Sequence, residues 1–255
     1  MRRLGTTISL FFLLLASIAT ASADEFLPGD ISNYVFVGNR TTPDIAIIDS
    51  RRDEVVAQIA LGAIADAYVL TGSGTKLIAS HLDDRALTIY NLAAQHIERV
   101  VELPFPPDEI ELHPAGDILA VTSPDAAALA LVPLDDGGPV IHPLEGFQPS
   151  DMMFGKNGET LLVASDDHNH ILVLDAASAD LIEDITVSEN TVALTRTPGG
   201  QVGFALHGES GKVSVLDLNN REHTATITLP GPAQQGFPTG NSLHILVPNA
   251  RDRSV

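Results

Sequence analysis

The chain has no cysteine and no tryptophan, and aromatic residues make up only 5% of its 255 residues. Without cysteine it forms no disulfide, holds no metal through thiolates, and carries no lipid or haem c attached through sulfur. So few aromatic rings argue against a sugar-binding surface of stacked rings.

Basic residues are scarce as well. There are 14 Lys and Arg against 33 Asp and Glu, and the formal net charge is −19. Such a field repels phosphate backbones and anionic lipid, so nucleic acid is not an expected partner. A cation or a basic protein surface suits the charge better, although high acidity also serves solubility alone.

The N-terminus differs in composition from the rest. Arg2 and Arg3 precede an apolar run over residues 8–18, and Ala21-Ser22-Ala23 stands before Asp24. This is the pattern of a secretory signal over residues 1–23, cleaved near Ala23, which leaves a formal charge of −21. No later apolar run approaches about 18 residues, so no membrane insertion is expected after the signal is removed. Export without disulfides favours a bacterial periplasmic or secreted protein.

A period of 42 residues runs through the chain. The motifs DIAIID, LTIYN, LALVP, HILVLD and KVSVLD end at this interval, at Asp49, Asn91, Pro133, Asp175 and Asp217. Turn glycines keep the same interval, at Gly74, Gly116, Gly158 and Gly200. A fixed period filled with short β-branched runs and Gly/Pro turns is typical of a radial stack of small sheets. The sequence therefore predicts an all-β fold, a β-propeller with one blade per period.

Each period holds four short runs, which predicts a blade of four antiparallel strands, A to D from the axis outward. In the fourth unit the runs are residues 151–154, 160–164, 170–174 and 181–187. Strands B and C are almost wholly apolar because neighbouring blades cover both their faces. Strands D, such as residues 54–59, carry charge between apolar residues and therefore face water on one side.

The sequence does not hold a whole number of blades. The chain opens on a strand B at residues 34–39, runs through four full units, and stops where the next strand C is expected. We therefore expect residues 24–255 to form a single propeller domain truncated at its C-terminus, with about 5–6 blades of 6–7. The alternative is a closed five-bladed ring in which residues 234–237 supply the inner strand of the first blade.

Residues 33–62, NYVFVGNRTTPDIAIIDSRRDEVVAQIALG, resemble the YVTN β-propeller repeat. Residues 113–123 and 155–165 are similar to the turn and following strand of that repeat. The resemblance implies a relation to exported propellers such as the methylamine dehydrogenase heavy chain and the haem d1 domain of nitrite reductase. It transfers no catalytic residue, because this chain has no C-x-x-C-H motif, no Trp-rich quinone-docking repeat and no Trp-Asp signature.

Histidines and acids gather in the B–C turns and D–A connections, which open on one face of a propeller, where ligands usually bind. His168 and His170 form an H-x-H motif, and because side chains alternate along a strand, both imidazoles would point the same way. His81 and His207 occupy equivalent positions three periods apart. The turns that hold these histidines also carry Asp83, Asp84, Asp166, Asp167 and Glu209. Imidazoles with carboxylates suit zinc or copper, so a metal site from these four histidines is one hypothesis.

The D–A connections supply a second candidate group, an acidic ring at the channel mouth that would concentrate cations or a basic partner. Its members are Asp66, Asp108, Glu109 and Asp151, together with Glu189.

No G-x-S-x-G elbow, H-E-x-x-H or Gly-rich phosphate loop occurs. The preferred interpretation is a monomeric, non-enzymatic scaffold that presents its loops to a protein partner or a small ligand. The alternatives are a metal or redox-cofactor protein and a lactonase-like propeller enzyme. A lactonase would need a base and a cation beside the oxyanion.

Overall fold

The computed structural model describes residues 31–240 and 244–248. The expected signal, residues 1–23, lies outside the described residues, as does the end of the chain from residue 249. Among the described residues the one helical element is a short 3-10 turn, η1 (Ile31–Asn33). No helix in this part of the chain is long and apolar enough to cross a membrane.

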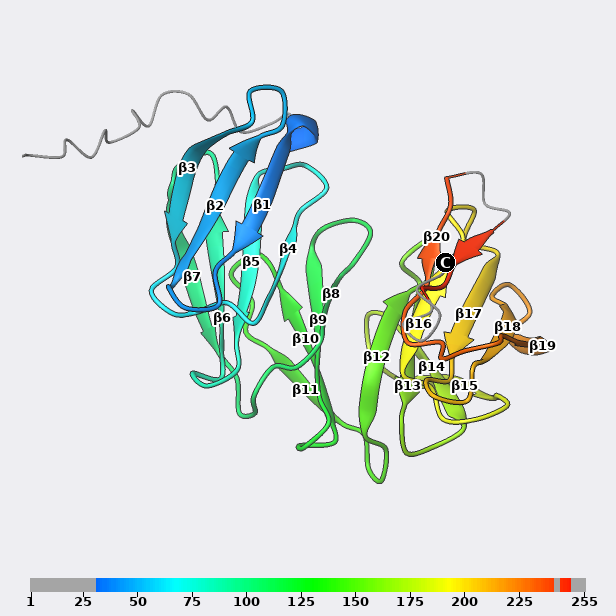
Figure 1. Cartoon of the computed structure of the whole chain (residues 1–255). Helices are drawn as coiled ribbons and strands as arrows, with labels where there is room; N and C mark the ends of the chain where they lie inside the picture. The colour runs from blue at the N-terminus through cyan, green and yellow to red at the C-terminus, as the bar shows by residue number, and fades with distance from the viewer. Residues whose placement is uncertain (1–30, 241–243, 249–255) are drawn as a thin grey trace, which may run out of the picture.

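The remaining elements are strands, arranged in six sheets that follow one another along the chain (Figure 1). The first sheet has three strands, β1 (Tyr34–Gly38), β2 (Asp44–Asp49) and β3 (Glu54–Ala60). The second has β4 (Ala67–Leu70), β5 (Lys76–His81), β6 (Ala86–Asn91) and β7 (His96–Glu102). The third has β8 (Ile110–Leu112), β9 (Ile118–Ser123), β10 (Ala128–Pro133) and β11 (Val140–Pro143).

The fourth sheet has β12 (Pro149–Phe154), β13 (Thr160–Ser165), β14 (His170–Asp175) and β15 (Leu181–Thr186). The fifth has β16 (Ala193–Arg196), β17 (Val202–Leu206), β18 (Lys212–Asp217) and β19 (Glu222–Thr228). The last holds β20 (Phe237–Pro238) and β21 (Ile245–Leu246). Every pairing is antiparallel between consecutive strands, so the predicted propeller of four-stranded blades is confirmed.

The 42-residue period has a direct geometric cause. The A–B turns pass through a left-handed residue at Gly74, Gly116, Gly158 and Gly200, with φ between 65° and 76°. The C–D turns do the same at Asp53, Gln95, Ala179 and Arg221. The pairing of strands C and D shifts register just before these turns, at Ile48, Tyr90, Leu174 and Leu216. Blades one, two, four and five therefore repeat their C–D turn and its bulge as well as their strands, and blade three is the exception, because its β10–β11 pairing has no register shift.

Apolar layers join the sheets. Ile45 and Ile47 of the first sheet pack against Leu77 and Ala79 of the second, and the same kind of contact recurs between each later pair. Strands B and C are buried on both faces in the middle blades, as expected from their composition. The first sheet is covered on one face within the described residues, which leaves Val35 50% and Val37 43% exposed on the other.

The closed five-bladed alternative is wrong. Phe237 pairs with Leu246 and Pro238 with Ile245, so this segment begins a sixth sheet instead of adding to β1. In Figure 1 the first and last sheets stand at opposite ends of the row. The first sheet has no strand on the inner side of β1 within the described residues.

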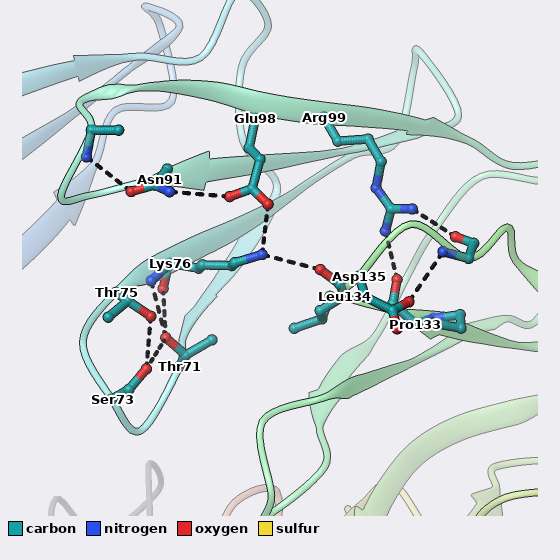
Figure 2. Close-up of polar contacts among 12 residues, drawn as sticks. Thr71, Ser73, Thr75, Lys76, Asn91, Glu98, Arg99, Pro133, Leu134 and Asp135 are labelled. Carbon is teal, nitrogen blue, oxygen red and sulfur yellow. Dashed lines mark hydrogen bonds and ion pairs between the residues drawn. The ribbon is translucent and has the colours of Figure 1, made fainter.

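The blades have two rims. We call the rim with the A–B and C–D turns the turn face, and the rim with the B–C turns and D–A connections the loop face. On the turn face, blades two and three are joined by side chains of β5 and β7 that bind main-chain carbonyls of the third blade (Figure 2). Arg99 donates to the carbonyls of Pro133, at 2.5 Å, and Gly137, at 2.6 Å, and Lys76 donates to that of Leu134, at 3.1 Å.

Candidate functional site

The loop face carries a cavity that includes predicted site residues. It has a volume of about 640 Å³ and lies where the B–C turns of blades four and five meet the D–A connections on either side of blade five. Its lining includes Asp166, Glu189, His207 and Glu209, four residues that the sequence placed on this face. Ser188, Asn190 and Gln234 add hydroxyl and amide groups. The cavity is therefore lined by carboxylates and neutral hydrogen-bonding groups.

Two of the carboxylates are held by neighbours. Lys212 donates to Glu189 at 2.5 Å, and this bond is the main reason that the pKa of Glu189 is lowered. Gln234 donates to Glu209 at 3.2 Å. The Asp166 carboxylate has no side-chain partner among the described residues, while the side chain of Asn190 donates to its main-chain carbonyl at 2.8 Å. The three carboxylates at this cavity thus outnumber the single lysine beside it.

His207 lines the cavity and is buried. Its Nδ1 lies 2.9 Å from the carbonyl oxygen of Asn190, which only accepts, so Nδ1 carries the proton and Nε2 accepts from Ser214 at 2.8 Å. The Ser214 hydroxyl then accepts from the hydroxyl of Ser188 at 2.9 Å, at the cavity wall. Burial lowers the pKa of His207, so the imidazole is neutral at pH 7.

His81 has the same surroundings three blades earlier. Its Nδ1 lies 2.8 Å from the carbonyl of Ile64 and its Nε2 lies 2.8 Å from the hydroxyl of Thr88. Each partner stands 126 residues before its counterpart around His207. His81 is 2% exposed and borders a cavity of about 450 Å³ between the first two blades. The repetition indicates that each histidine ties strands B and C to the preceding D–A connection.

His168 and His170 each contact a different acid. His168 Nδ1 lies 2.6 Å from Asp167, and the ring stacks on Phe147 at a centroid distance of 5.8 Å. His170 Nδ1 lies 2.8 Å from Asp184 on β15. The described residues contain no group of three or more His, Asp or Glu placed to hold a metal ion. The geometry therefore does not support a zinc or copper site built from His81, His168, His170 and His207.

The sequence reasoning missed the hydroxyl partners of these histidines, although the period held a signal for them. Histidine at the end of strand B accompanies a hydroxyl seven residues later, in His81/Thr88 and His207/Ser214. Where serine replaces the histidine, as at Ser123 and Ser165, that later position is Ala130 or Leu172. The two positions change together because a buried hydroxyl needs a hydrogen-bonding partner.

The predicted acidic ring is only partly assembled. The Asp66 carboxylate accepts from the amide of Leu82 at 2.6 Å, within its own blade. Asp151 accepts from the amides of Leu194, at 2.6 Å, and Met152, at 2.7 Å. Loss of hydration is the main cause that raises the pKa of Asp108, with the charge of Asp125 second. Burial and then the charges of Asp151 and Asp108 raise the pKa of Glu109, so these three acids lie close together beside the inner strands β8 and β12, and Asp66 is not among the charges that act on them.

Glu111 belongs to this group of acids and was not predicted. It lies in β8, two residues after Glu109, whose carbonyl accepts from the amide of Thr122 just before the strand begins, and it therefore points to the same side as Glu109. Burial and then the charge of Asp151 raise the pKa of both glutamates to about 7. Arg196 offsets part of this effect at Glu111. Alternation along an inner strand was the signal that could have identified Glu111.

Comparison with known proteins gives the fold and no family. No family model matches the chain, and no curated protein matches it. Hydrazine synthase of Kuenenia stuttgartiensis is similar in structure, with a TM-score of 0.58 and 18% identity over 64% of this chain and 48% of that one. The β-propeller domain of Cps50 (Swd1) of Myceliophteria thermophila gives 0.63 and 15% over 72% of this chain and 62% of that domain. The chain thus spans about half of the first structure and less than two thirds of the second.

Proposed function

We propose that the protein is an exported β-propeller scaffold, without catalytic activity of its own, that binds a cationic group at the loop-face cavity between blades four and five. The observation that carries the proposal is this cavity of about 640 Å³, in which Asp166, Glu189 and Glu209 outnumber the one neighbouring cation, Lys212. The group that binds is an ammonium or a guanidinium, because the carboxylates neutralise its positive charge and the neighbouring amide and hydroxyl groups orient it through hydrogen bonds.

The same cationic chemistry is available from a basic protein surface or from a small polyamine. The net charge of −19 steers either toward the protein, and the effect weakens as salt rises. The resemblance to YVTN-type exported propellers and the signal-like N-terminus support a periplasmic location. A scaffold with fixed blades and variable loops suits such recognition, since loops vary without loss of the stacked core.

The test is calorimetric titration of the purified protein with spermidine and with a lysine-rich peptide, which separates the two sources. We expect binding of at least one probe and a loss of about fivefold or more in affinity in Asp166→Asn and in Glu209→Gln. Asp135→Asn, on the turn face, is the matched control. Equal affinity in all variants, or no binding of either probe, would contradict the proposal. The metal and lactonase alternatives stay predictions, testable by zinc titration of a His168→Ala/His170→Ala variant and by a lactone hydrolysis assay.

A further inference from the structure

The turn face carries a second polar cavity, of about 340 Å³, on the side of the molecule opposite to the loop-face cavity. It lies between blades four and five. The A–B turn of blade four supplies Lys156, Asn157 and Glu159, and blade five supplies Gln201 from its A–B turn and Arg221 from its C–D turn. Two cations thus border one depression in a chain of strongly negative net charge.

Most other cations in the described part of the chain are engaged. Lys76 pairs with Glu98 and Lys212 with Glu189. Arg99 and Arg196 donate to main-chain carbonyls. Lys156 and Arg221, by contrast, make no ion pair or side-chain hydrogen bond with any residue that the structure describes. Their charges remain available to a ligand.

The packing of Lys156 shows that its position is specified. Gly200 has φ of 73°, and a Cβ atom at this residue would lie 2.3 Å from Cβ and 2.7 Å from Cδ of Lys156. The lysine stem therefore lies across the turn of the next blade, where only glycine leaves room for it. At the corresponding turn one blade earlier, Gly158 admits the ring of His113 instead. The cation thus reaches the cavity through contact with blade five.

Arg221 is placed by the C–D turn. It adopts φ of 58°, the left-handed conformation that Asp53, Gln95 and Ala179 take in other blades. Among these equivalent residues the arginine is the one cation, and it stands on the blade that faces Lys156. Asn219 and Gln201 add amide groups beside it. A point-like ammonium, a planar guanidinium and amide donors together match an oxyanion that accepts several hydrogen bonds.

We propose that this turn-face cavity binds a phosphate group, free or at the end of a small metabolite, through Lys156 and Arg221. Glu159 also lines the cavity, and its negative charge repels an anion, so it lowers the affinity for phosphate. The overall field of the protein repels anions, and saturable binding would therefore have to arise from local contacts.

The test is isothermal titration with inorganic phosphate, pyrophosphate and acetate at fixed ionic strength. We expect affinity to rise from acetate to phosphate to pyrophosphate. Lys156→Met keeps the stem over Gly200 and removes the charge, and Arg221→Gln removes the guanidinium; each should weaken phosphate binding by about fivefold or more. Glu159→Gln should strengthen it by about threefold.

Arg40→Met removes an exposed cation from the first blade and serves as the control, with unchanged affinity expected. Thermal melts of each variant establish that it is folded. The proposal is overturned if phosphate shows no saturable binding up to about 20 mM, a concentration that corresponds to about 2 kcal/mol of affinity. It is equally overturned if Lys156→Met and Arg221→Gln bind phosphate as tightly as Arg40→Met does.

Discussion

The hydroxyl of Tyr68, on strand A of the second blade, donates to the carbonyl of Phe36 on β1 at 2.8 Å. The same hydroxyl accepts from the amide of Gly38 at 3.2 Å. Asn33 and Asn39 bond to the β2 side, so the alternation along β1 points the main-chain groups of Phe36 and Gly38 to the opposite edge. Tyr68 therefore occupies two groups that an inner strand of the first sheet would otherwise take.

Gly38 completes this arrangement, since a Cβ atom there would lie 2.8 Å from the ring of Tyr68. Both residues depart from the period. Other blades place Ile110, Met152 and Leu194 at the position of Tyr68, and Ser80, Thr122, Ala164 and Leu206 at that of Gly38. The exceptional pair thus occurs at the one described sheet that has three strands and no inner neighbour for β1.

Tyr68→Phe should open this edge while the ring keeps its packing. We expect the amide of Gly38 to exchange about fivefold faster with solvent, equivalent to about 1 kcal/mol for the lost hydrogen bond. Because Tyr34-Val35-Phe36-Val37 is uncharged and rich in strand formers, self-association should also rise with concentration. Hydrogen exchange and light scattering measure the two effects. Tyr90→Phe is the control, and unchanged exchange at Gly38 would show that the hydroxyl does not protect the edge.

His81→Ser should destabilise the second blade, because it leaves the hydroxyl of Thr88 and the carbonyl of Ile64 without their partner. We expect a loss of about 2 kcal/mol in the free energy of unfolding. The double change His81→Ser/Thr88→Ala copies the Ser123/Ala130 pair of blade three and should recover about 1 kcal/mol of this loss. Urea denaturation measures both. A double variant no more stable than the single one would contradict the pairing.

These cases show which features the sequence could predict. The blades were predictable because turns, bulges and strand lengths recur every 42 residues. The separation of His81, His168, His170 and His207 was not, because a period gives equivalent positions in different blades without the distance between them. Their roles depend on local partners such as Thr88 that no single motif contains. The acids near β8 and β12 were predictable in part. Alternation along a strand predicts which side chains share a face, but it gives no distance between side chains on different strands.

Arg99 should matter more for stability than its place near the surface suggests. In blades one, two, four and five the C–D turn follows an Asp or Asn whose side chain accepts turn amides, as Asp175 does from Ala177 and Ser178. Blade three has Pro133 there, and Arg99 of the preceding blade binds the carbonyls of Pro133 and Gly137 instead (Figure 2).

Arg99→Met should therefore cost about 1–3 kcal/mol of stability, because two charge-assisted hydrogen bonds are lost. Adding Pro133→Asp restores a local acceptor for the turn amides and should recover part of the loss. Arg40→Met, whose side chain has no described partner, is the control and should change stability by less than about 0.5 kcal/mol. Thermal unfolding measures all four proteins. An equal loss in Arg99→Met and Arg40→Met would show that the bridge between the blades contributes nothing.

Glu111 gives a prediction about pH. Burial and the charge of Asp151 raise its pKa from the ordinary 4.5 to about 7, so between these values the folded chain binds a proton that the unfolded chain has released. Stability should therefore be highest below pH 4.5 for this group and fall as pH rises through 7. Glu111→Gln removes the titration of this side chain.

The variant should match the parent protein near pH 4.5 and exceed it at pH 8 by about 1 kcal/mol, a value reduced from the full shift because solvent and Arg196 screen part of the charge. Denaturation curves across this range make the comparison. Glu159→Gln, at the exposed turn face, is the control and should leave the pH dependence unchanged. If Glu111→Gln were less stable than the parent at pH 8, the carboxylate would be held by favourable contacts, and the acids near β8 and β12 would not be under electrostatic strain.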